Sequence, residues 1–121
     1  MASFKPQKHK LEMWENTTHK ESMQFLDKND QLIDITGYTA KMTIKDEIDG
    51  DEILTLDTET LTGSRLIIDE DISKFTIYIE TVLEDYVGVY DVFFWDALGQ
   101  KHKPIDVSPV KIFPAVTDLE A

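Results

Sequence analysis

The stretch Val87–Trp95, Val-Gly-Val-Tyr-Asp-Val-Phe-Phe-Trp, decides the fold class of this chain. It is the longest apolar run in the sequence, and its β-branched and aromatic residues favour a strand. Apolar side chains stand on both of its alternating faces near its end, which is typical of a central strand covered on both sides. A hairpin turn signal follows at Asp96–Gly99. The sequence therefore predicts a β protein built around this strand.

Two residues of this expected strand need an explanation of their own. Trp95 is expected in the core, because aromatic residues in strands are usually buried. Asp91 is a charge inside an apolar strand, so it needs a hydrogen-bonding partner if its face is buried. We expect that partner to be a loop amide or a lysine, and we expect no chemical role for Asp91.

Alternation of apolar and polar residues marks further strands, most clearly in Tyr38–Lys45 and Lys74–Glu80. Pro104 is expected to push its own strand towards a sheet edge, because proline cannot donate to a ladder. Thr81–Tyr86 is expected to form one helical turn or to cross between two sheets. The two earliest runs are expected to form a strand pair or one interrupted strand. The shorter predicted strands are Lys10–Trp14, Lys20–Leu26, Ile53–Asp57, Arg65–Ile68, Lys101–Val107 and Pro109–Phe113.

Seven to nine short strands, with turn signals about every eight to twelve residues, favour an antiparallel β-sandwich. A small closed barrel is the alternative. The length of 121 residues suits one domain. We expect a flexible arm over Met1–Lys10, a single β-sandwich domain over residues 11–114, and a C-terminal tail over residues 115–121.

The arm is polar and basic, so it does not resemble a secretory signal. No apolar run approaches the roughly 20 residues that span a bilayer. The chain has no cysteine, so disulfides and thiol chemistry are absent, which favours a cytosolic origin.

The charge is strongly negative and unevenly distributed. Residues 1–45 carry seven lysines against six acids, a net +1, while residues 46–121 carry five basic residues against eighteen acids, a net −13. Such a surface repels phosphate backbones, so we expect no nucleic-acid partner. The acidity is explained either by solubility and suppressed self-association or by a partner with a basic face.

Metal binding is considered for two groups of residues. The acidic cluster over Asp46–Glu59 could offer oxygen ligands to calcium, with Asp69–Asp71 if the two loops meet. Its spacing does not match an EF-hand, because Lys45 and Leu56 would fall at ligand positions, so a solvated acidic hairpin tip is favoured. The histidines that a zinc site would use, His9, His19 and His102, are dispersed and are expected to be surface or core residues.

No catalytic constellation is visible, so we expect no enzyme activity and no cofactor. Ser64, Ser73 and Ser108 lack the glycine-rich elbow and nearby histidine of a nucleophile. Five scattered glycines form no phosphate-binding loop. Acids are so plentiful that no pair of them indicates glycoside hydrolysis. A carbohydrate-binding module, with or without stabilisation by calcium, is the alternative function, with Trp14 and Tyr78 as exposed rings for a sugar.

Two sequence segments lie on either side of the middle of the chain, Asp34–Ile44 and Tyr86–Phe94. In each of these phrases, as we call such short segments, a turn signal comes directly before an alternating strand. With the other strand and turn phrases, over residues 20–114, they resemble small immunoglobulin-like phage and prophage virion proteins, including the N-terminal domains of baseplate upper proteins. The phrases that carry the resemblance are Asn29–Tyr38, Ala40–Lys45, Ile53–Leu56, Gly88–Val92, Asp96–Gly99 and Val107–Ile112.

The resemblance implies an immunoglobulin-like sandwich and a non-enzymatic structural role at the tail, baseplate, neck or capsid surface of a tailed-phage virion. The protein would be made in the host cytoplasm, and its partners would be other virion proteins. The chain ends without a coiled coil or receptor-binding head, which favours an accessory or adaptor role. The strongly acidic body suggests a homo-oligomer in which Lys5, Lys8 and Lys10 meet acidic surface on the next copy. Neither nucleic acid nor membrane is expected as a partner.

Overall fold

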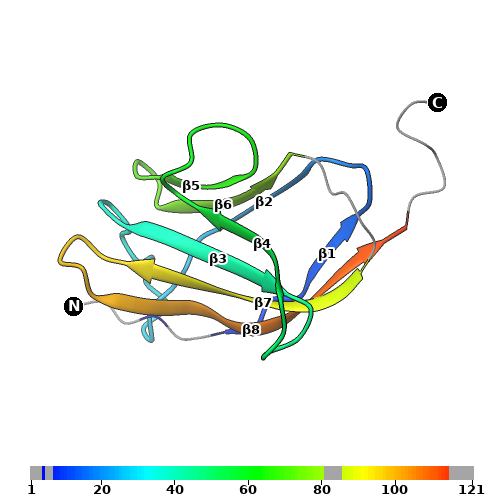
Figure 1. Cartoon of the computed structure of the whole chain (residues 1–121). Coiled ribbons are helices and arrows are strands. Elements are labelled where there is room, and N and C mark those ends of the chain that lie inside the picture. Colours follow the sequence, from blue (N-terminus) through cyan, green and yellow to red (C-terminus); the bar gives the residue numbers. More distant parts are fainter. Residues whose placement is uncertain (1–3, 5–6, 81–85, 115–121) are drawn as a thin grey trace.

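The computed structural model describes Phe4 and residues 7–80 and 86–114, which form eight β-strands and no helix (Figure 1). Nothing in this part of the chain is a helix long and apolar enough to cross a membrane. The strands are β1 Leu11–Trp14, β2 His19–Met23, β3 Thr39–Lys45, β4 Glu52–Asp57, β5 Arg65–Asp69, β6 Lys74–Ile79, β7 Tyr86–Trp95 and β8 Lys101–Phe113.

The strands form two sheets that lie face to face (Figure 1). The larger sheet has the order β1-β8-β7-β3-β4, and the smaller has the order β2-β6-β5. This is the order of an immunoglobulin variable-type sandwich, in which strands G, F, C and C′ form one sheet and B, E and D the other. The pair β1–β8 is parallel and the other pairs are antiparallel. The predicted immunoglobulin-like β-sandwich is confirmed.

The core lies between the two sheets and follows the predicted alternation. Every second residue of β3, from Ala40 to Ile44, is buried, and so are Phe75, Ile77 and Ile79 of β6. Phe94 of β7 lies at the centre of an aromatic cluster, with ring centroids 5.4 Å from Phe4, 5.4 Å from Phe25 and 5.1 Å from Phe75. These edge-to-face contacts join both sheets and the N-terminal segment into one core.

Strand β7 is central in the larger sheet, as predicted, but the expectation for Trp95 is wrong. Tyr90, Val92 and Phe94 are buried against the smaller sheet. Because side chains alternate along a strand, Trp95 points the other way, to the outward face that it shares with Phe93. Apolar character on both faces of β7 therefore does not mean that a second layer covers both faces.

The expectation for Pro104 is also wrong. Residues 101–113 form one continuous strand that lies between β1 and β7 in the order of the sheet. β1 pairs only with its end at Val110–Phe113, and beside Pro104 the N-terminal segment makes the isolated bridge Gln7↔Ile105. The register steps from Phe94↔His102 to Val92↔Ile105, so β8 has one extra residue over this stretch. This bulge accommodates the proline inside the sheet, which a regular ladder would not.

The N-terminal part of the chain is tied to β8. The amide of Gln7 donates to the Pro104 carbonyl at 3.3 Å, and the amide of Asp106 donates to the Gln7 carbonyl at 2.9 Å. With Phe4 packed on the core, the described part of the expected arm contacts the sandwich. The early runs form neither a strand pair nor one strand, because β1 and β2 belong to different sheets. The segment Thr81–Tyr86 lies outside the described residues except for Tyr86, which begins β7, and the expected tail at 115–121 lies wholly outside them.

Candidate docking surface

The outward face of the five-stranded sheet carries an unusual mixture of lysines and aromatic residues. Cross-strand pairing places Lys41 beside Phe93, Thr43 beside Asp91, and Lys45 beside Val89. The hairpin after β7 brings Lys101 opposite Trp95. Directly paired residues share a face of the sheet, so these side chains gather on one surface.

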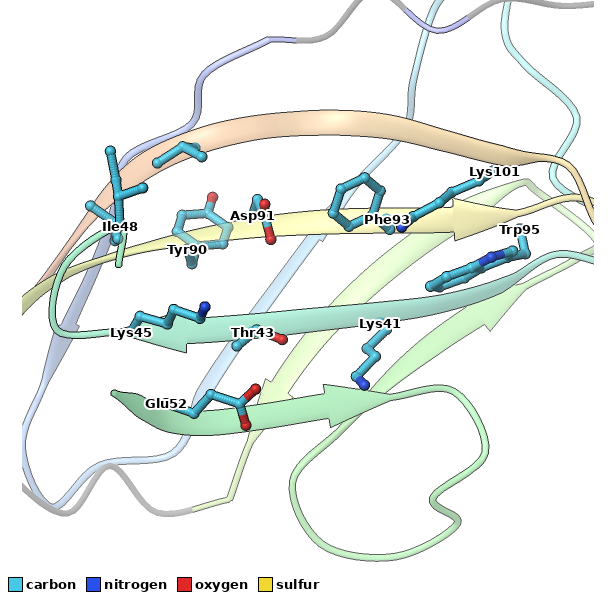
Figure 2. A pocket seen from close by; sticks show the side chains of 12 residues that line it. Lys41, Thr43, Lys45, Ile48, Glu52, Tyr90, Asp91, Phe93, Trp95 and Lys101 are labelled. Carbon is cyan, nitrogen blue, oxygen red and sulfur yellow. The ribbon is translucent and has the colours of Figure 1, made fainter. Parts of the chain in front are cut away.

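These side chains enclose a hollow of about 420 Å³ (Figure 2). Figure 2 shows that Ile48, from the β3–β4 loop, stands at one end and that Trp95 and Lys101 stand at the other. Ile48 is 65% exposed. We call this region the lysine–aromatic hollow; the residues that define it are Lys41, Thr43, Lys45, Glu52, Asp91, Phe93, Trp95 and Lys101.

Lysine ammonium groups lie over the rings of the hollow. The Lys101 Nζ is 4.1 Å from the centroid of the Phe93 ring and 5.5 Å from that of the Trp95 ring. The Lys103 Nζ is 5.2 Å from the Phe93 centroid. Each such cation–π contact contributes about 0.5–1 kcal/mol at an exposed site. The rings therefore hold positive charge above the sheet, and these ammonium groups partly cover their faces.

The lysines of this face differ in how their charge is neutralised. Lys103 forms ion pairs with Asp91 at 3.4 Å and Asp106 at 3.3 Å, so the expectation of a lysine partner for Asp91 is confirmed. The amide of Val107 and then the Lys103 ammonium lower the pKa of Asp106. Within the described residues, Lys41, Lys45 and Lys101 have no carboxylate within ion-pairing distance. The hollow is thus lined by three lysines and two carboxylates, Glu52 and Asp91, on a protein of net charge −12. Glu52 lies opposite Lys45, and Asp57 lies opposite Lys41 on β4.

The structure does not bring the predicted contact residues together. Lys8 and Lys10 are exposed ahead of β1, and the Lys10 Nζ is 3.7 Å from Glu12. Lys5 falls outside the described residues. Trp14 is 55% exposed at the end of β1 and stacks on Phe113 at 5.0 Å.

Tyr78 lies on β6 of the other sheet, where the Arg65 guanidinium covers its ring at 5.1 Å.

Sequence reasoning missed the hollow, although its signal was present. The alternating Lys41-Thr43-Lys45 face of β3 and the Lys101-x-Lys103 pattern after the hairpin were both visible. What was missing was the cross-strand register that joins them to Phe93 and Trp95.

The expectation that the histidines are dispersed is wrong for two of them. His9 and His19 both bond the Glu21 carboxylate, with the His19 Nε2 at 3.2 Å from Oε1 and the His9 Nε2 in contact with Oε2. His102 bonds Asp96 at 2.9 Å. Within residues 7–80 and 86–114, no three histidine or acidic side chains are arranged to hold a metal ion.

The three serines considered as nucleophiles bond the backbone instead. Ser64 accepts from the Glu80 amide at 2.9 Å, and Ser73 accepts from the Ile35 amide at 3.2 Å. Ser108 accepts from the His9 amide at 3.0 Å and donates to the Asp106 carbonyl at 2.7 Å. The acidic loop likewise caps itself, since Asp46 accepts from the Asp51 amide at 2.9 Å.

No protein-family model matches this chain, and no curated protein matches it.

Proposed function

We propose that this chain is a non-enzymatic structural component of a tailed-phage virion that acts by protein–protein docking. The observation that carries the docking part is the lysine–aromatic hollow on the outward face of the five-stranded sheet. The virion part is supported by the resemblance of the strand phrases to small phage proteins. Two of those phrases, Ala40–Lys45 and Gly88–Val92, belong to β3 and β7, the adjacent strands on which the hollow is built.

A docking role is favoured over sugar stacking at this face. A sugar-binding platform needs an open ring face, and the Lys101 ammonium lies over both Phe93 and Trp95. Aromatic residues are enriched in protein interfaces, and lysine stems can pack on apolar surface while their ammonium groups stay in water.

The proposed partners are other virion proteins, with further copies of this chain in a homo-oligomer. Strands β1 and β4 form the edges of the larger sheet, and β2 and β5 form those of the smaller. Strand edges offer backbone groups to a neighbouring strand, which is a second means of docking. The proposed location is the virion, after synthesis in the host cytoplasm.

The test is the composition of particles from the phage or prophage that encodes the chain. Quantitative mass spectrometry of purified particles should find the chain at a fixed copy number, and gold-labelled antibody should locate it at one position. Particles that lack the chain while it accumulates in the host cell would overturn the proposal. A second phage protein of similar abundance that is not incorporated serves as the control for adhering material.

A carbohydrate-binding module is the second candidate, and the exposed ring of Trp14 favours it. Glycan-array binding that is lost in Trp14→Ala and retained in Tyr78→Ala would support a sugar site at the end of β1. An array without signal for the unmodified protein would remove this candidate.

A further inference from the structure

We propose that the lysine–aromatic hollow binds an extended acidic peptide segment of a partner protein. This inference depends on the proposed docking function and names the chemistry of the partner. Three observations carry it: the charge of the hollow, its direction along the sheet, and the state of its aromatic rings.

The charge of the hollow selects an anionic occupant. Lys41, Lys45 and Lys101 line it without ion pairs in the described part of the chain, with Glu52 opposite Lys45 and Asp57 opposite Lys41. Lys103 beside it is held by Asp91 and Asp106. Because Asp91 is paired with Lys103, Glu52 is left as the carboxylate in the lining that faces three lysines. Carboxylates of a partner would neutralise the remaining positive charge.

The direction of the hollow selects an extended segment. It follows the outward face of β7 from Val89 to Trp95, a length of about 20 Å at roughly 3.3 Å per residue. Lys41 and Lys45 lie on the same face of β3 (Figure 2). Four residues of strand at roughly 3.3 Å each separate them by about 13 Å along the strand. Acidic residues at alternating positions of an extended peptide repeat at matching distances, so about six residues would fill the hollow.

The rings argue against other anions. Bases and sugars bind by stacking on open ring faces, and the Lys101 ammonium lies over the rings of Phe93 and Trp95. A long polyanion would also meet the remaining surface of a protein with net charge −12. A short acidic peptide meets the lysines without that wider repulsion. Ile48 at the far end offers an apolar contact for one of its side chains.

The test is a titration of the ¹⁵N-labelled full chain with the peptide acetyl-(Glu-Thr)₄-amide, followed by NMR. We expect saturable shifts of the Trp95 indole N–H and of β3 and β7 amides. The apparent affinity should weaken at least about fivefold from low to high salt, because screening acts on exposed charges. Absence of saturable shifts at the hollow would overturn the inference.

A matched pair of double variants separates the hollow from bulk charge. Lys41→Glu with Lys101→Glu should weaken peptide binding at least about tenfold. Lys20→Glu with Lys28→Glu makes the same change of net charge on β2 and the following turn, and it should leave binding within about twofold. Equal weakening in both double variants would overturn the inference, because net charge alone would then explain binding.

Competing occupants are measured on the same sample. Binding of a galacturonate tetramer or a thymidine octamer at the hollow, without binding of the peptide, would replace the peptide by a sugar or a nucleic acid. Self-association in light scattering that the Lys41→Glu, Lys101→Glu variant abolishes would assign the hollow to a second copy. Each result overturns the peptide while leaving particle incorporation, the test of the proposed function, to be decided separately.

Discussion

The two faces of β7 have similar apolar character and very different environments. Tyr90, Val92 and Phe94 point into the sandwich and are at most 1% exposed, whereas Val87 on the opposite face is 68% exposed. The inward face is covered by the smaller sheet and the aromatic cluster. The outward face keeps two aromatic rings beside lysines on a surface that no other strand of the described chain covers. Composition thus identified the strand, and the second sheet decided which face is buried in the core and which faces outward.

Among the variants that test the contrast between the two faces of β7, Phe94→Ala is expected to lower stability most. The Phe94 ring is fully buried and touches Phe4, Phe25 and Phe75, so its loss leaves a cavity at the junction of the sheets. We expect the free energy of unfolding in urea to fall by about 3–5 kcal/mol. The neighbouring Phe93→Ala is the control, with an expected loss below about 1 kcal/mol. Equal losses would show that the two faces do not divide stability as described.

Gly88→Ala is expected to have the next largest effect. A methyl group at this position would lie 2.3 Å from the backbone carbonyl oxygen of Lys45, so the end of β3 must move away from β7. Overpacking of this kind costs about 1–3 kcal/mol in unfolding free energy. The measurement is urea unfolding, with exposed Val87→Ala as the control. An unchanged midpoint would contradict the close approach of the two strands.

Tyr90→Phe tests the polar contact on the inward face. The Tyr90 hydroxyl donates to the His9 carbonyl at 2.5 Å, and its loss should cost about 1 kcal/mol near neutral pH. Burial raises the pKa of Tyr90 well above its ordinary value of 10.0. The unfolded tyrosine therefore ionises first, and stability falls as the pH rises above about 10. The variant should show a smaller alkaline loss in thermal melts, and an identical pH profile would contradict this.

The smallest effect is expected at the hairpin that carries Lys101 to the outward face. The hydrogen bond with His102, and then the amides of Gln100 and Leu98, lower the pKa of Asp96 below 3.8. A lowered pKa stabilises the fold above pH 3.8, and this stabilisation is lost as the pH falls through the folded value. Asp96→Asn should therefore lower the melting temperature at pH 7 and have less effect at the acidic end of the folded range.

The control for this hairpin prediction is Asp49→Asn, in the exposed β3–β4 loop. It should leave the melting temperature nearly unchanged at both pH values. A loss in Asp96→Asn that is as large at pH 3 as at pH 7 would show that the carboxylate charge is not what stabilises the turn.

The local sequence predicted much of the fold because strands and turns are governed by short-range rules. Alternation located β3, β6 and β7, and the turn at Asp27–Asp30 formed as predicted, with the Asn29 amide donating to the Asp27 carboxylate at 2.8 Å. The turn at Asp96–Gly99 also formed, with Gly99 at a φ of 80°. These features need only the two-residue period of a strand and the backbone preferences of Asp, Asn and Gly.

The candidate site could not be predicted in the same way, because it depends on contacts between distant segments. Lys41 meets Phe93 only through the β3–β7 register, and Lys101 reaches both rings only after the hairpin closes. His9, which lies ahead of β1, and His19 of β2 meet at Glu21, although each looks isolated in the sequence. Pro104 could lie inside the sheet only because a bulge in β8 accommodates it.

By itself, the sequence determined the β class, the periods of its strands, the positions of its turns and the acidic balance of the chain. Tertiary structure alone decided that Trp95 faces outward, that β8 is internal, and that three lysines share one hollow with two rings. The physical reason is that alternation assigns side chains to two faces without saying which face is covered. Only the packing of the second sheet makes one face the core and leaves the other as a surface.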